Sequence, residues 1–242
     1  MTDSAQRIRL PKCHRFWRRS CWRRQSSSSG TQSRNEVTSG SEVRFAHLLG
    51  QPSVAKIRSA LASHSPVGAE EEEGVRKAAV ALIFRLGKGD ALELLFIKRA
   101  DYEGDPWSGQ IAFPGGRVEA GDASLAETAI RETREETGID LAREGMIIGT
   151  LDDLRPQSIR LPAIVVRPYL ALLDRDEPLR LSNEVALAFW LPFAGLARTE
   201  SWHEDTVFAR GIQINARVFR HEQHTIWGMT ERILAQLLAL LD

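Results

Sequence analysis

Hydrophobic and polar positions divide most of the chain into short segments with either strand or helix periodicity. Residues 78–86 and 92–98 form two apolar, partly alternating runs separated by Gly-Lys-Gly-Asp, which predicts a β-hairpin. Further strands are predicted at residues 110–113, 146–151, 163–173 and 185–191. A closing hairpin is predicted from residues 211–220 and 223–226.

Helical spacing of apolar residues marks the remaining segments. Helices are predicted at residues 54–62, 124–137 and 230–241, with a short one starting within 192–197. The last long helix carries a stripe formed by Ile233, Leu234, Leu237, Leu238 and Leu241. Strands with helices available for both faces predict an α/β fold, an α/β/α sandwich around a mixed sheet.

The segment 124–137 has well-defined helix ends. Ser124 followed by Glu127 fits a capping box, with Asp122 as a competing N-cap, and Gly138 stands where a left-handed C-cap residue belongs. Ahead of it, residues 114–116 read Pro-Gly-Gly. This predicts a turn whose backbone can come close to an ion or a phosphate.

Three carboxylates, those of Glu132, Glu135 and Glu136, fall within an arc of roughly 100° on this helix. Like charges at these spacings repel one another unless something neutralises them. Mg²⁺ or Mn²⁺ favours carboxylate oxygens in sites that often also hold phosphates. A neighbouring stripe can pack on a sheet and would aim the acids outward into a cleft; it comprises Ala126, Ala129, Ile130, Thr133 and Thr137.

From Gly116 to Ile139 the sequence resembles the Nudix box, which reads Gly, five residues, Glu, seven residues, then Arg-Glu-aliphatic-x-Glu-Glu-x-Gly-aliphatic. Asp122 occupies the position of the first Glu, the Arg arrives one residue late, and Thr133 replaces an aliphatic residue. The resemblance implies a Nudix-type α/β/α sandwich and a hydrolase that uses Mg²⁺ or Mn²⁺. The implied metal ligands are Glu132, Glu135 and Glu136 with the Gly116 carbonyl, and Arg131 braces a glutamate. The general base is expected to be a box glutamate, Glu135, or a carboxylate from a later loop; Glu184 is one such carboxylate, although a structural role fits it better.

Segments around the box resemble the coenzyme A pyrophosphatase branch. The upstream signature is represented by Arg99-Ala100 and Gly109-Gln110, although Gly104 stands where that branch has an Arg. Residues 183–185 and 226–230 also match the branch. The implied reaction cleaves coenzyme A or an acyl-coenzyme A into a phosphopantetheine derivative and adenosine 3′,5′-bisphosphate. Two alternatives stay open: hydrolysis of ADP-ribose, NADH or another nucleotide, and a catalytically silent module that senses a nucleotide.

Several other side chains have both a structural and a functional interpretation. Trp107 is either a rim aromatic or a surface on which substrate stacks, and three arginines are either solvated or in contact with phosphates: Arg155, Arg160 and Arg167. Ser108 lacks the surroundings of a nucleophilic serine, and His221 and His224 lie on a predicted hairpin where we expect no metal role.

Composition points to an ordinary globular protein. The 242 residues are 43% hydrophobic and 26% charged with a formal net charge of zero, so nothing in the composition indicates nucleic acid as a partner. The small nucleotide-type substrate that we expect is implied by the resemblance to Nudix hydrolases. The longest apolar stretches are shorter than the roughly 20 residues that cross a bilayer, which argues against a membrane protein. A homodimer stays open.

Residues 1–42 differ from the rest of the chain. They are rich in Arg and Ser and poor in acids, which predicts a disordered basic leader ahead of a Nudix domain at residues 43–242. The leader fits an organellar transit peptide or a start codon placed too far upstream, and less well a basic tail that binds RNA. Both cysteines, Cys13 and Cys21, lie within it, so the domain has no disulfide and fits a reducing compartment. We expect the cytoplasm, or the mitochondrion if the leader is a transit peptide.

Overall fold

The computed structural model describes residues 43–242 apart from 71, 157–160, 175–177 and 210. The predictions for the leader and for Arg160 concern residues outside this part. No helix among the described residues is long and apolar enough to cross a membrane.

The main sheet is mixed and has seven strands. They are β1 Arg76–Leu86, β2 Leu92–Arg99, β3 Ile111–Ala112, β4 Gly115–Arg117, β5 Gly145–Thr150, β6 Ile164–Leu173 and β7 Val185–Pro192. The order runs β3-β2-β1-β6-β5, with β4 also paired to β1 and β7 to β2. Strands β1 and β6 are parallel, whereas β1 and β2 form the predicted antiparallel hairpin around the 3-10 turn Lys88–Asp90.

The two long hairpin strands separate partway along their length. β1 pairs with β2 only at its last residues, where Phe84 faces Leu94, and with β4 near its start, where Ala79 faces Gly116. At its other end β2 pairs with β3 instead. Residues 111–117 therefore occupy the opening between the two strands, and this opening is where the site described below lies.

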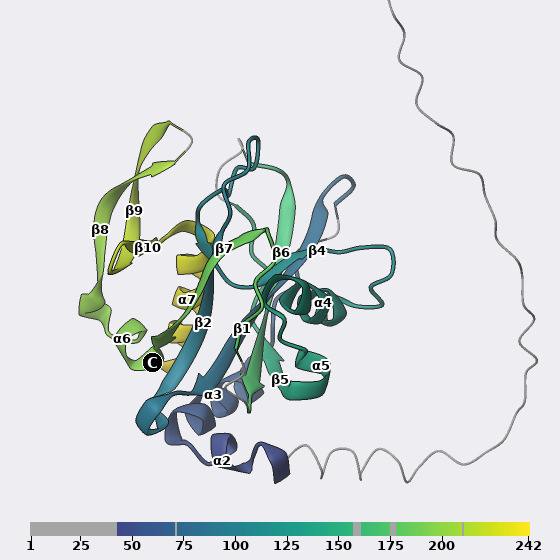
Figure 1. Cartoon of the computed structure of the whole chain (residues 1–242), viewed down its shortest axis with the longest axis vertical. Coiled ribbons are helices and arrows are strands. Elements are labelled where there is room, and N and C mark those ends of the chain that lie inside the picture. The colour runs from purple at the N-terminus through teal and green to yellow at the C-terminus, as the bar shows by residue number, and fades with distance from the viewer. Residues whose placement is uncertain (1–42, 71, 157–160, 175–177, 210) are drawn as a thin grey trace, which may run out of the picture.

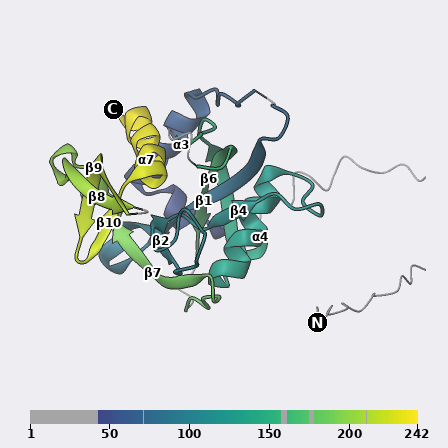
Figure 2. The ribbon, with the colours of Figure 1, turned by 90° about the horizontal axis from the view of Figure 1, so that it is seen from above.

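Helices cover both faces of the sheet (Figures 1 and 2). Helices α3 Pro52–Ser63 and α7 Gly228–Leu241 lie on one face, and α4 Leu125–Thr137 and α5 Leu141–Glu144 lie on the other. Successive side chains of β1 alternate between the two layers: Leu82 and Phe84 join the core under α3 and α7, while Ala81 and Ile83 join the core under α4. The predicted α/β/α sandwich is confirmed.

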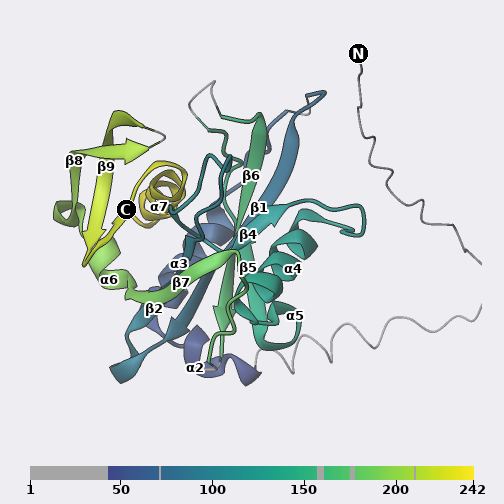
Figure 3. The same cartoon turned by 45° about the horizontal axis from the view of Figure 1, so that its top comes forward.

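A second, three-stranded antiparallel sheet packs beside α7 (Figure 3). It contains β8 Trp202–Ala209, β9 Ile212–His221 and β10 His224–Ile226, in the order β10-β9-β8. The short helix α6 Phe193–Leu196 and the 3-10 turn Thr199–Ser201 connect it to the main sheet. The predicted closing hairpin corresponds to β9 and β10.

The structure confirms the longer predicted elements, but it also contains elements that were not predicted. Strand β8 was not predicted because apolar and polar residues do not alternate regularly along it, and the helices α2 Ala46–Leu49 and α5 are too short to show a period. The turn predicted at residues 114–116 is limited to a reversal of the chain around Pro114, because Gly115 and Gly116 already pair with β1 as strand β4. Gly115 has a φ of 151°, and a Cβ there would overlap the carbonyl oxygen of Ala79. Glycine is thus required for close strand approach, not for a tight turn.

Candidate functional site

Helix α4 is fixed at both ends by its own sequence. The Ser124 hydroxyl accepts a hydrogen bond from the backbone N–H of Glu127 at 3.2 Å, and the Glu127 carboxylate accepts one from the N–H of Ala123 at 2.9 Å. Gly138 is left-handed with a φ of 79°, and its N–H donates to the carbonyl of Arg134. The predicted caps are confirmed, with Ser124 in the N-cap position and Asp122 left for another role.

Asp122 anchors Arg131. The Nε and Nη2 atoms of Arg131 donate to the two carboxylate oxygens of Asp122 at 2.9 and 3.0 Å, and Nη1 donates to Glu132 at 3.0 Å. The hydroxyl of Thr128 also donates to Asp122 at 2.9 Å. Hydrogen bonds from Arg131 hold the pKa of Asp122 well below its ordinary value, and Asp122 in turn raises the pKa of Arg131. The guanidinium is therefore rigidly placed beside Glu132.

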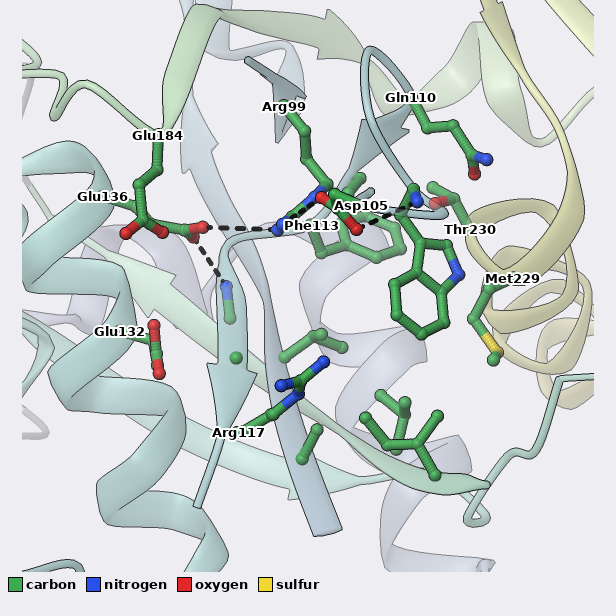
Figure 4. A pocket seen from close by; sticks show the side chains of 18 of the residues that line it. Arg99, Asp105, Gln110, Phe113, Arg117, Glu132, Glu136, Glu184, Met229 and Thr230 are labelled. Carbon is green, nitrogen blue, oxygen red and sulfur yellow. Dashed lines mark hydrogen bonds and ion pairs between the residues drawn. The ribbon is translucent and has the colours of Figure 1, made fainter. Parts of the chain in front are cut away.

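A pocket of about 470 Å³ opens between α4, the start of β1, strand β4, the loop at residues 104–110 and the start of α7 (Figure 4). Glu132 and Glu136 reach it from α4, and Glu184 reaches it from the segment preceding β7. The backbone N–H of Gly115 donates to the carboxylate of Glu136 at 2.8 Å. A Cβ on Gly116 would overlap the carboxylate of Glu132, so the Gly116 backbone lies directly against that group.

Burial makes it unfavourable for these acids to be charged at the same time. Glu136 is only 3% exposed, and its burial raises its pKa to about 8 even though the Gly115 N–H and Arg99 favour the charged form. The charges of Glu132 and Glu184 raise it further. Burial likewise raises the pKa of Glu132, opposed by Arg131. A positive ion in the pocket would relieve the repulsion.

Glu136 lines the pocket, as expected of acids aimed into a cleft, but it does so from the buried side of the helix. It lies in the buried face of α4 with Thr133 and Thr137, because this face turns toward the sheet and β4. Glu135 has an opposite placement. Its side chain is 59% exposed, receives a hydrogen bond from Arg131 at 3.4 Å, and is not among the residues that line the pocket. Within the described part of the chain, no three His, Cys, Asp or Glu side chains converge as a ready-made metal site.

Two arginines face the acids across the pocket. Arg99 donates to Asp105 at 2.9 Å and lies 4.0 Å from Glu136, and its buried Nε has no hydrogen-bond partner. Arg117 is exposed and extends into the pocket from the end of β4 (Figure 4). Burial would raise the pKa of Asp105, but hydrogen bonds from Arg99 and from the Trp107 N–H and the charges of Arg99 and Arg117 lower it.

Sequence reasoning did not assign Arg99, Arg117 or Asp105 to the site. Arg117 directly follows the Gly-Gly pair, so its position could have been noticed, whereas the partnership of Arg99 with Asp105 depends on how the loop folds. The pocket combines carboxylates with guanidinium groups. Such a combination suits a divalent cation together with phosphate oxygens.

The loop at residues 104–110 forms the far wall. Trp107 lines the pocket and packs against Ala78 and Val166. The Ser108 hydroxyl accepts from the N–H of Tyr102 at 2.6 Å and donates to its carbonyl at 3.1 Å, so Ser108 holds the loop together. Gly104, which also lines the pocket, has a φ of 84° that a side chain would strain.

The remaining predicted residues lie elsewhere. Arg155 pairs with Glu72 at 2.8 Å and Arg167 with Asp153 at 2.7 Å, and neither arginine lines this pocket. His224 is buried, with its ring stacked 4.9 Å from that of Phe189.

Comparison with known proteins gives a family and several relatives. The family model described as NUDIX domain matches residues 75–210. An uncharacterized Nudix hydrolase, NudL, of Salmonella paratyphi B is 34% identical over 131 residues, which cover 54% of this chain and 66% of the relative. Among solved structures, an Ap4A hydrolase of C. elegans in a binary complex is 27% identical with a TM-score of 0.43, covering 50% of this chain and 83% of that one. A MutT/nudix family protein of Enterococcus faecalis is 20% identical with a TM-score of 0.47, covering 81% and 72%.

Proposed function

The chain belongs to the NUDIX domain family, and we propose that it hydrolyses the pyrophosphate bond of coenzyme A or an acyl-coenzyme A with Mg²⁺ as its cofactor. The family and the Nudix hydrolase relatives indicate a pyrophosphohydrolase acting on a nucleoside diphosphate derivative. The observation that supports the proposal most directly is the pocket in which Glu132, Glu136 and Glu184 face Arg99 and Arg117.

The donor atoms of the pocket fit a hard divalent cation. Glu132 and Glu136 supply carboxylate oxygens, and the Gly116 backbone lies against Glu132. Because burial disfavours the charged form of both acids, a bound cation would stabilise them. Nudix hydrolases generally use divalent metal ions. We propose Glu132, Glu135, Glu136 and the Gly116 carbonyl as ligands of Mg²⁺, or of Mn²⁺ in its place. Bound there, the ion would supply positive charge to the phosphoryl oxygens and make a nearby water more acidic.

The protein's own groups position the reactants. Arg131, held by Asp122, fixes the carboxylate of Glu132, and the Gly115 N–H fixes that of Glu136. The attacking water gives its proton to a carboxylate, either Glu135 at the exposed side or Glu184 at the pocket. The water oxygen then bonds to one phosphorus while the bridging oxygen leaves with the other phosphoryl group.

Arg99 and Arg117 are the proposed phosphate contacts. The Arg that the coenzyme A signature carries upstream is absent at Gly104, yet Arg117 extends into the same pocket with an exposed guanidinium. Guanidinium groups form paired, charge-assisted hydrogen bonds with phosphate oxygens. For coenzyme A the products would be 4′-phosphopantetheine and adenosine 3′,5′-bisphosphate.

A second candidate function is hydrolysis of ADP-ribose, NADH or another nucleotide. It is favoured by Gly104, which stands where the coenzyme A signature has an Arg. A catalytically silent nucleotide sensor is the alternative from a different class. It fits less well, because all three box glutamates are present.

A hydrolysis panel tests these alternatives. The full chain would be incubated with Mg²⁺ and coenzyme A, an acyl-coenzyme A, ADP-ribose, NADH or nucleoside triphosphates, beside Glu136→Gln and the control Glu200→Gln. Glu200 is an exposed acid outside the pocket. We expect turnover of coenzyme A that Glu136→Gln abolishes and Glu200→Gln preserves. Faster turnover of ADP-ribose or NADH would favour the second candidate, and binding without turnover of any compound would favour the sensor.

A further inference from the structure

A second pocket continues from the first, on the side away from the acids. It has a volume of about 590 Å³ and shares Pro106, Trp107, Gln110 and Met229 with the first pocket. In Figure 4, Gln110 and Met229 lie opposite Glu132 and Glu136. A molecule whose pyrophosphate lies at the acids can therefore extend past Trp107 into the second pocket. Each pocket is within the size range of small-molecule sites.

The far wall of the second pocket comes from the small sheet and the start of α7. Ile214 of β9 and Trp227 give it an apolar surface that joins Met229. These residues follow the segment 75–210 that the family model matches. The wall thus lies outside the matched segment, and it can distinguish substrates that share the same pyrophosphate chemistry.

The charged groups of this pocket are balanced among themselves. Arg217 pairs with the buried Glu231 at 3.3 Å, and Arg232 donates to the carbonyl of Arg155 at 2.6 Å while its charge also acts on Glu231. With Glu204, the lining contains two arginines and two glutamates. A second phosphate or a carboxylate would gain little in such surroundings, whereas an uncharged chain would lose few polar contacts and would bury apolar surface.

We infer that the pocket formed by Trp107, Ile214, Trp227 and Met229 binds the uncharged, elongated arm that is joined to the pyrophosphate of the substrate. The inference rests on the proposed function and adds which half of the substrate the small sheet recognises. In coenzyme A this arm is the pantetheine chain, which has amide groups and apolar carbons but no charge. The nucleotide half then lies on the arginine side of the acids.

The test introduces a charge into the wall. Ile214→Asp places a carboxylate in the second pocket, and Gln213→Asp adds the same charge to the adjacent, exposed position of β9, which lines neither pocket. Binding of 4′-phosphopantetheine, which has no pyrophosphate bond to cleave, would be measured by calorimetry with Mg²⁺ present. KM for coenzyme A and the inhibition constant of adenosine 3′,5′-bisphosphate would be measured under the same conditions. Ile214→Ala serves as a milder variant, with circular dichroism of each protein as the folding control.

We expect Ile214→Asp to weaken 4′-phosphopantetheine binding and to raise KM for coenzyme A by about tenfold, with a smaller change in Ile214→Ala. Inhibition by adenosine 3′,5′-bisphosphate should stay at the wild-type value, as should every constant of Gln213→Asp. If inhibition by the nucleotide product weakens instead, the pocket binds the nucleotide half and the inference is wrong. Unchanged constants in both Ile214 variants would also overturn it.

One combination of results would contradict the proposed function but not the inference about the arm. If wild-type protein binds 4′-phosphopantetheine and Ile214→Asp weakens this binding, but coenzyme A is not hydrolysed, then the arm pocket stands and the proposed reaction is wrong.

Discussion

Replacing Asp122 by Asn should destabilise the protein much more than the loss of an ordinary surface ion pair. The Asp122 carboxylate accepts four hydrogen bonds, two from Arg131, one from the Thr128 hydroxyl and one from the Glu119 N–H, each between 2.9 and 3.0 Å. Asn keeps the size of the side chain but removes the charge opposite Arg131. It also turns an amide NH₂ toward groups that are themselves donors.

The structure sets the size of the effect. The side chains of Asp122 and Arg131 are 5% and 22% exposed. Breaking a buried pair costs about 3–5 kcal/mol, and the partial exposure of Arg131 places this one at the lower end, about 3 kcal/mol. For a domain of this size that corresponds to a fall in melting temperature of about 6–12 °C.

Lowering the pH should reduce the destabilisation caused by Asp122→Asn. The pKa of folded Asp122 lies below its ordinary value of 3.8, so its charge stabilises the fold fully above that pH and progressively less as the pH falls below it. The difference in free energy of unfolding between wild type and Asp122→Asn should therefore be largest near neutral pH and shrink as the pH approaches 3.

Urea unfolding at pH 7 and at a series of acidic values measures both quantities. Glu72→Gln is the matched control, because Glu72 bonds Arg155 at 2.8 Å but the two side chains are 53% and 38% exposed, and such pairs contribute about 0–1 kcal/mol. Equal losses in the two variants, or a loss in Asp122→Asn that does not depend on pH, would refute the reasoning.

Three further outcomes are expected. In Glu136→Gln, turnover should fall by about a hundredfold or more. The melting temperature of this variant should stay equal or rise, because Gln removes the cost of burying an acid, and added Mg²⁺ should raise the melting temperature of wild type much more than that of the variant. Steady-state kinetics of Arg117→Gln should show KM for coenzyme A raised about tenfold with the fold intact, since its guanidinium is exposed in the pocket; an unchanged KM would remove Arg117 from the phosphate site. Gly115→Ala should lower the free energy of unfolding by about 3 kcal/mol, because the new Cβ overlaps Ala79 at a φ of 151°; a loss below 1 kcal/mol in denaturant titrations would contradict this.

Local sequence signals correctly predicted helix α4 and strand β1, the elements that carry the site. The Ser124 cap and the Gly138 stop mark both ends of α4 because capping depends on neighbouring residues alone. The apolar, partly alternating run of β1 predicted a strand because this pattern also depends on neighbouring residues alone. The edge strand β8 gave no such signal, since its residues pair with β9 without burying a regular face.

The interior of the site depended on contacts that the sequence does not show. Glu184 follows Glu136 by 48 positions, and the two reach one pocket only because β7 pairs with β2 and brings the preceding segment back toward α4. The inward turn of Glu136 required strand β4 beside the helix, where the Gly115 N–H meets its carboxylate. The spacing of the three glutamates alone could not distinguish this buried acid from the exposed Glu135.

The charge arrangement argues for hydrolysis over mere nucleotide binding. A site that only holds an anion needs cations, and Arg99 and Arg117 would suffice for that. Here Glu132, Glu136 and Glu184 also line the pocket, and carboxylates repel a phosphate at close range. A divalent cation held by the carboxylates would make both sets of charges favourable together, and it would also make a nearby water more acidic. A silent sensor accordingly predicts nucleotide binding that does not depend on Mg²⁺, whereas the proposed hydrolase predicts that binding and turnover both require it.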